Sequence, residues 1–293
     1  MPVLKESELV INPDGSIYHL KVRPHDIAPR VILVGDPKRV DLIAAHLDHI
    51  ENRVSNREFV TVTGPYQQKR VTIMATGIGT DNIDIVMNEL DALVNIDFST
   101  RQVKPDHTRL HILRLGTTGA VQADIPVNSY IASRTGLGMD GLVHFYKAPP
   151  GLLDQPLAEA FREWTGWDAR LPDPYAVEAS SGFFEAMTSG MHEGITLTAP
   201  GFYGPQGRVV RLPLAHPGIS DRILSFRFEG KRIVNFEMET SALYALGRML
   251  GHEVLTVCLA IANRATGDFN AHYENHVSDL SILLLGRLTG SID

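Results

Sequence analysis

The sequence predicts a three-layer α/β/α sandwich built around a central mixed sheet. Short, largely apolar runs such as 31–34, 71–75 and 254–261 are typical of strands that are buried on both faces. Segments with apolar residues at helical spacing separate these runs, and this alternation is the pattern of α/β proteins. The chain has 293 residues and shows no internal repeat or linker, so we expect a single domain over residues 1–293.

The first half of the chain is expected to alternate strands and helices. Residues 1–23 are polar and mixed, and we expect them to pack against the domain as an N-terminal arm. Asp81 or Asn82 is placed to cap the second helix, and residues 116–119 read as a glycine-rich turn after a strand. The expected elements are a strand at 31–34, a helix at 38–47, a strand at 71–75, a helix at 83–93, and strands at 110–115 and 129–133.

The second half begins with a longer region that interrupts the alternation. Residues 148–195 are expected to form a helical elaboration, broken at proline and glycine positions. Beyond it we expect a strand at 195–198, a helix that opens at Phe236 and runs to Leu250, a strand at 254–261 and a closing helix at 279–288.

The overall charge argues against nucleic acid as the main partner. The formal net charge is −7, so a broad basic binding surface is not expected. The 27 basic residues are nevertheless 20 arginines and only 7 lysines, and arginine offers a planar fork of donors for phosphate or carboxylate groups. Lineage bias explains the excess equally well.

No targeting or membrane feature stands out in the sequence. The first residues lack an apolar signal-like stretch, and no run approaches the roughly 20 apolar residues needed to span a bilayer, so we expect a cytoplasmic protein. The single cysteine, Cys258, lies in an apolar run and is interpreted as a buried structural thiol. His272 and His276 have a metal-compatible spacing but no third ligand nearby, so no metal site is expected.

Several arginines and threonines lie just past predicted strand ends, where ligands bind in open α/β sheets. Arg39 follows a Gly-Asp-Pro turn that begins at Gly35, and Arg114 stands inside an apolar strand ending before Thr117. A charge there is costly unless it meets a carboxylate or a ligand anion, so both interpretations stay open. The motifs of dinucleotide-binding folds, P-loops and serine hydrolases are absent.

A second group of residues suits a flat polar ring. Gln206 offers an acceptor and donors, Arg208 offers donors only, and Phe202 is placed to stack on a ring. A uracil ring shows a carbonyl, an N–H and a second carbonyl in a row, which this pair can read. Glu237 and Glu239 follow at a predicted helix start, where two carboxylates in three helical residues do not share a face; one of them suits adjacent sugar hydroxyls.

Together these segments resemble the nucleoside phosphorylase-I family, from Tyr18 to the C-terminus. The resemblance rests on six ordered motifs, at 35–39, 55–59, 75–79, 114–119, 202–208 and 236–240. It implies a nucleoside phosphorylase-like fold and a pentosyltransferase of nucleoside catabolism. The Gln-x-Arg pair is what favours uracil over a purine. We therefore expect reversible phosphorolysis of uridine to uracil and ribose 1-phosphate in pyrimidine salvage, with deoxyuridine and thymidine left open.

The resemblance also implies residue roles and partners. Catalysis would rest on Arg114, Arg208 and Gln206. Inorganic phosphate would be the co-substrate, with no organic cofactor. His19 and Arg57 would be lent to a neighbouring subunit, which implies a homo-oligomer, a dimer or a hexamer built of dimers. The implied contacts are phosphate at Gly35, Arg39, Arg57, Arg114 and Thr117, ribose at His19, Thr117, Glu237, Met238 and Glu239, and base at Phe202, Gln206, Arg208 and Arg264.

The sequence departs from the family pattern in places. Gly204 and Pro205 stand in swapped order, which could shift the loop that reads the base. Relatives hold a monovalent cation near the dimer interface; Glu58 fits that site, but Asn82 stands where a serine is usual, so the cation stays open.

Three rival functions remain. A purine nucleoside phosphorylase would place an acid near the last core strand, where this chain has Asn263 and Arg264. A nucleosidase would have little use for so many phosphate-directed arginines. A non-catalytic nucleoside-binding protein would bind without turnover.

Overall fold

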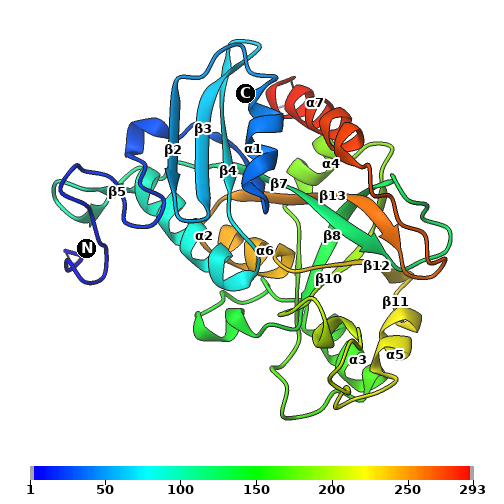
Figure 1. Ribbon diagram of the computed structural model, residues 1–293. Helices are drawn as coiled ribbons and strands as arrows, with labels where there is room; N and C mark the ends of the chain where they lie inside the picture. The colour runs from blue at the N-terminus through cyan, green and yellow to red at the C-terminus, as the bar shows by residue number, and fades with distance from the viewer. Residues whose placement is uncertain (1–2, 291–293) are drawn as a thin grey trace.

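The computed structural model describes residues 3–290 and contains a mixed sheet of 11 strands with helices on both sides (Figure 1). Its strands are β1 (Arg30–Val34), β2 (Asn52–Asn56), β3 (Phe59–Tyr66), β4 (Lys69–Ala75), β7 (His111–Ala120), β8 (Tyr130–Gly138), β9 (Tyr175–Glu178), β10 (His192–Thr198), β11 (Arg227–Phe228), β12 (Lys231–Glu237) and β13 (Glu253–Asn263). The short strands β5 (Ile96–Asp97) and β6 (Gln102–Val103) pair separately.

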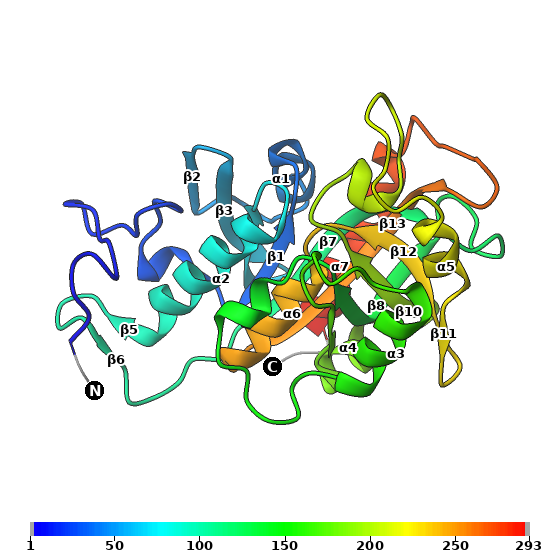
Figure 2. The same ribbon diagram turned by 90° about the horizontal axis from the view of Figure 1, so that it is seen from below.

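The helices are α1 (Pro37–Ala44), α2 (Thr80–Asn95), α3 (Gln155–Thr165), α4 (Ser181–Met187), α5 (Ile219–Ser225), α6 (Thr240–Met249) and α7 (Glu274–Gly290). Short 3-10 turns occur at Pro24–Asp26, Leu142–Phe145 and Gly204–Gln206. α1 packs on α7 and α7 on α4, whereas α2 packs on α6. Figure 2, the view from below, shows α2 and α6 side by side in front of the sheet. No helix among residues 3–290 is long and apolar enough to cross a membrane.

The predicted fold class is confirmed, because the sheet combines parallel and antiparallel pairs. β1 pairs in parallel with β4 and β7, whereas β3 pairs antiparallel with β2 and β4. β12 pairs with both β10 and β7. Since β10 also pairs with β8, β8 with β13 and β13 with β7, these strands close into a ring. The other half of the sheet stays open and ends at β2.

The predicted strand at 110–115 is longer than expected, because residues 116–119 continue β7 instead of turning. β7 pairs with β13 from His111 to Ala120, so the Gly-Thr-Thr-Gly stretch keeps its ladder partners. Gly116 serves close packing here. A Cβ at this position would collide with the Arg114 guanidinium and come within 2.7 Å of Sγ of Cys258.

The predicted helix start at Phe236 was wrong. Residues up to Glu237 belong to β12, and α6 begins only at Thr240. The backbone of Phe236 is paired with Leu197 of β10 and Gly119 of β7, and this pairing overrides the local helical pattern.

The predicted cap of the second helix was also wrong. Gly79 stands at the N-cap of α2 and no side chain caps it, so neither Asp81 nor Asn82 does so. Both Gly77 (φ 74°) and Gly79 (φ 101°) lie in the left-handed region, which lets the chain turn from β4 into α2 within a few residues.

The sequence pattern missed several strands, including β5, β6, β11 and β12. Residues 52–66 form the hairpin of β2 and β3, and the 148–195 region holds β9 between α3 and α4. β9 pairs antiparallel with β8, so this region contributes to the main sheet as well as adding helices.

Candidate active site

A cavity of about 840 Å³ opens at the carboxyl ends of β1, β4, β7, β12 and β13, where α/β sheets bind ligands. It brings together many residues that the sequence analysis singled out: Gly35, Arg39, Arg114, Thr117, Phe202, Gln206, Arg208, Glu237, Met238 and Glu239. Segments that lie far apart in the sequence therefore meet at one site.

Arg114 lies at the centre of one wall and is only 5% exposed. Its Nη2 pairs with Oε2 of Glu239, and its Nη1 lies 3.3 Å from Oε2 of Glu237. Burial alone would lower the pKa of Arg114, but the two carboxylates outweigh it and hold that pKa above its ordinary value. Nε of Arg114 is buried and has no hydrogen-bond partner among the described residues.

The two carboxylates meet because they leave the strand at a sharp junction, not because they share a helix. Oε2 of Glu237 accepts hydrogen bonds from the backbone N–H groups of Glu239 (2.8 Å) and Thr240 (2.9 Å). Its Oε1 accepts one from the Thr198 hydroxyl at 2.6 Å. Both carboxylate oxygens of Glu237 thus accept hydrogen bonds from protein groups. Glu239 accepts from the Gly79 N–H at 2.8 Å, and burial, opposed by Arg114, raises its pKa.

Arg39 adds a second guanidinium to the same end of the cavity, beside Gly35. Its Nη1 donates to the carbonyl of Leu115 at 3.4 Å, and it forms no ion pair among residues 3–290. Burial and then the charge of Arg114 lower its pKa. A guanidinium without a carboxylate partner, next to Arg114 and a glycine turn, forms a site suited to an oxyanion.

The loop after β10 forms another wall. Gln206 is buried, and its Oε1 accepts a hydrogen bond from Nη1 of Arg208. Arg208 also donates to the carbonyl of Phe202 at 2.7 Å, and its guanidinium lies 3.9 Å from the centre of the Phe202 ring. These contacts hold an amide, a cation and an aromatic face together at one end of the cavity.

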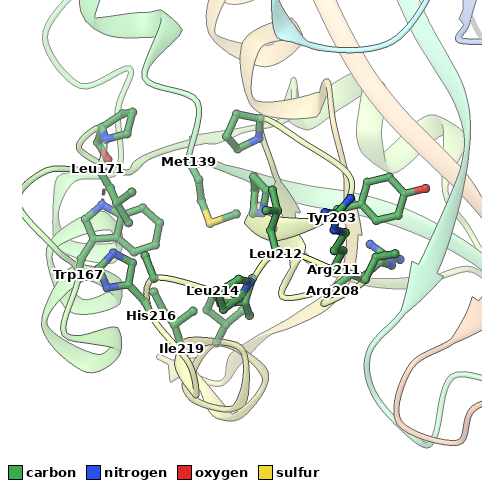
Figure 3. Close-up of a pocket in the computed structure, with 18 residues that line it drawn as sticks. Met139, Trp167, Leu171, Tyr203, Arg208, Arg211, Leu212, Leu214, His216 and Ile219 are labelled. Carbon is green, nitrogen blue, oxygen red and sulfur yellow. Dashed lines mark hydrogen bonds between the residues drawn. The ribbon is translucent and has the colours of Figure 1, made fainter.

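A separate apolar cavity of about 630 Å³ lies on the other side of this loop (Figure 3). Figure 3 shows Trp167 and Leu171 on one side of it and Tyr203 and Arg208 on the other. Arg208 lines both cavities, so the loop separates them.

Three predicted site residues do not line the large cavity of their own chain. His19 is held by Glu89, with Nδ1 2.6 Å from Oε1, and its carbonyl accepts from Asn56. Arg57 is exposed at the β2–β3 turn, with its guanidinium 5.8 Å from the Tyr18 ring. Arg264 lies closer, 5.1 Å from the ring centre of Phe236, which itself lines the cavity; burial and then Arg208 lower its pKa.

Some lining residues carried no sequence signal. Phe269 and Ile261 line the cavity, and single apolar residues of this kind form no recognisable motif; Ile78, which also lines it, lay within the 75–79 motif without an assigned role. Cys258 lies behind Arg114, and burial raises its pKa to about 12, which agrees with a structural thiol.

Loss of the Arg114 charge should leave two buried carboxylates, Glu237 and Glu239, without their cationic partner. We expect Arg114→Leu to lower the free energy of unfolding by about 3–5 kcal/mol at neutral pH. The pKa of Glu239 in the native state should rise further, so that, as pH falls, the native state binds a proton at a higher pH than the unfolded state does. The deficit should then shrink as pH falls through that raised pKa. Urea unfolding at pH 5 and pH 8 measures both effects.

The matched control is Arg109→Leu, which removes an exposed arginine whose Nη1 lies 3.3 Å from Glu253. Its cost should stay below about 1 kcal/mol and vary little with pH. Equal costs for the two variants would show that the buried cluster contributes no more than a surface pair.

The sequence and the fold both match known proteins. The family model described as the phosphorylase superfamily matches residues 29–286. A Trypanosoma brucei nucleoside phosphorylase that shows uridine phosphorylase activity superposes with a TM-score of 0.85 at 30% identity, and the match covers 96% of this chain and 99% of that one.

Two curated relatives show the same similarity over most of their length. The uridine phosphorylase of Thermococcus kodakarensis is 29% identical over 87% of this chain and 80% of its own. The uridine phosphorylase of Escherichia coli K12 is 29% identical over 85% of this chain and 87% of its own. With a family model that matches most of its length, this chain belongs to the phosphorylase superfamily.

Proposed function

We propose that this enzyme catalyses the reversible phosphorolysis of uridine to uracil and ribose 1-phosphate. The observation that carries the proposal is the layout of the large cavity, which has cationic donors for an oxyanion at one end and the Gln206–Arg208 pair at the other. The similarity to the uridine phosphorylases of T. kodakarensis and E. coli supports it.

At the anion end, Gly35, Arg39, Arg114 and Thr117 bind and orient inorganic phosphate. Arg39 lines the cavity and has no carboxylate partner among residues 3–290, so its charge is available to the anion. No organic cofactor is needed, since phosphate itself is the nucleophile and co-substrate.

The ribose lies between the two ends. Glu239 accepts hydrogen bonds from the 2′ and 3′ hydroxyls, and Met238 packs on the apolar face of the sugar. The oxygens of Glu237 already accept protein donors, so Glu237 acts on ribose by holding Arg114 and the backbone of Glu239 in place.

The base end stabilises the leaving group. As phosphate approaches C1′ from the face opposite the base, the C–N bond breaks and negative charge grows on uracil. Gln206 and Arg208 donate to that charge, Arg264 assists from beside Phe236, and Phe202 packs on the ring. The acceleration comes from positioning and electrostatic stabilisation, without a covalent enzyme intermediate.

The active site is completed by a second subunit. Tyr18, His19 and Arg57 lie together outside the cavity of their own chain, which supports their contribution to a neighbour's site. We propose a homo-oligomer, a dimer or a hexamer built of dimers, in which Arg57 reaches the partner's phosphate and His19 the ribose 5′ hydroxyl.

The first test follows uridine and, in parallel, inosine by ultraviolet absorbance with and without phosphate. We expect loss of uridine that depends on phosphate, because both ends of the cavity then have their ligands. Cleavage of inosine instead would favour a purine nucleoside phosphorylase. Cleavage without phosphate would favour a nucleosidase, and binding without turnover a non-catalytic protein.

The second prediction concerns the leaving group. Arg208→Ala should lower kcat for uridine by about 10²–10³, by analogy with the loss of one oxyanion donor. Arg211→Ala is the matched control, since Arg211 is exposed three residues later and has no polar partner among residues 3–290. Steady-state kinetics measure both, and normal turnover by Arg208→Ala would remove this residue from the mechanism.

The third prediction tests the shared site by mixing inactive variants. Arg39→Ala and Arg57→Ala should each be impaired, but co-assembled mixtures should recover about a quarter of wild-type sites, because mixed dimers hold one intact site. Arg39→Ala mixed with Arg114→Leu should not recover, since both defects lie in one cavity. Equal recovery of activity in the two mixtures would contradict an active site shared between subunits.

A further inference from the structure

A buried hydrogen-bonded cluster lies behind the sugar end of the cavity, at the start of α6. The Tyr175 hydroxyl is 2.9 Å from Oδ1 of Asp140 and 3.0 Å from Oγ of Ser241. Ser241 in turn donates to Oδ2 of Asp140 at 2.9 Å. None of these three side chains lines the large cavity, so none is available to touch a substrate.

The cluster is linked to the cavity carboxylates through the backbone of α6. The N–H of Ser241 donates to the Thr198 hydroxyl at 3.0 Å, and that hydroxyl donates to Glu237 at 2.6 Å. Glu237 also takes the N–H of Thr240, so the first turn of α6 is capped from two strands. The N-cap residue of this helix is Glu239 itself.

Strand β8 is shaped to let the cluster form. A Cβ at Gly138 would lie 2.5 Å from the Tyr175 ring, and one at Gly136 would lie 3.1 Å from the backbone of Ser241. Glycines two residues apart on one face of a strand therefore make room for both the tyrosine and the helix. Tyr175 comes from β9, within the region that the sequence set apart as an elaboration.

We propose that Tyr175, Asp140 and Ser241 are positioning residues for ribose recognition, which fix the first turn of α6 and thereby aim Glu239 at the sugar hydroxyls. The proposal rests on the proposed function. A phenylalanine would fill the same space as Tyr175, so a hydroxyl buried beside a carboxylate is explained by its hydrogen bonds. Asp140 accepts from Ser241 in the first turn of α6, the end of a helix where negative charge is favoured.

The pKa shifts agree with a buried cluster whose hydrogen bonds matter. Burial raises the pKa of Asp140, although the Leu142 N–H, Tyr175 and Ser241 all oppose that rise. Burial also raises the pKa of Tyr175 well above its ordinary value, so its proton stays on the hydroxyl and remains available for donation.

The test compares uridine with 2′-deoxyuridine, which lacks one of the hydroxyls proposed to bind Glu239. Tyr175→Phe should lower kcat/KM for uridine about tenfold, the effect of one buried hydrogen bond, and affect 2′-deoxyuridine less. The ratio of the two kcat/KM values should therefore fall several-fold. A tyrosine that merely supports the core would lower both values together and leave the ratio unchanged.

Tyr244→Phe is the matched control. Tyr244 is also fully buried and lies on α6 itself, where its hydroxyl donates to the carbonyl of Ser133 at 2.7 Å and accepts from the N–H of Thr256 at 2.9 Å. These bonds do not reach the cavity carboxylates, so its substrate ratio should equal that of the wild type. Ser241→Ala removes another hydroxyl of the cluster and should shift the ratio as Tyr175→Phe does. It replaces Tyr175→Phe in the test if Tyr175→Phe does not fold.

The outcomes separate the two proposals. A wild-type enzyme without phosphate-dependent uridine turnover would overturn the proposed function and this inference with it. A wild-type enzyme that turns uridine over, with an unchanged ratio in Tyr175→Phe and Ser241→Ala, would overturn this inference alone. An equal shift in Tyr244→Phe would also overturn it, because any loosening of α6 would then suffice.

Discussion

A guanidinium buried between two carboxylates organises this molecule. Arg114 stands on β7, Glu237 ends β12 and Glu239 is the N-cap of α6, so the pairing joins two strands and the start of a helix at one point. An unpaired ion buried in such surroundings would lower the free energy of unfolding by several kcal/mol, so the guanidinium and the carboxylates each need their partners. The geometry of the cavity and the register of the surrounding elements are therefore set by the same contact. Stability and function cannot be altered separately at these positions.

The secondary structure was predictable wherever tertiary pairing agrees with the local pattern of apolar residues. β1, β4 and β13 are apolar along most of their length, and α1 and α7 follow helical spacing, so these elements were found. The errors occurred where tertiary pairing overrides local preference. Phe236 and Glu237 suit a helix start, yet Phe236 is paired with both β10 and β7, and Glu237 with β10, which keeps them in β12. Gly116 suggests a turn, but the need to pack beside Arg114 explains it.

The site was predictable to the extent that strand ends converge. Gly35 and Arg39 follow β1 and Gln206 follows β10, whereas Arg114 lies within β7, and the topology places all four around one cavity. The support behind them was not predictable. Tyr175 belongs to a strand that no sequence pattern revealed, and its link to Ser241 crosses 66 residues of sequence, a distance at which local spacing carries no information.

The closed ring of strands limits the conformational entropy that the site can lose when a ligand binds. β7, β13, β8, β10 and β12 each have a partner on both sides, so none can slide without breaking two ladders at once. Two ladders restrain the residues at the ends of each of these strands, which limits the conformational entropy that a ligand can remove there. The segment from Val209 to Ala215, by contrast, has no backbone hydrogen bonds among residues 3–290, and Val210 and Leu212 are 78% and 80% exposed. This segment lines the apolar cavity beside the base end, so the part of the molecule with the fewest backbone restraints lies next to the Gln206–Arg208 loop.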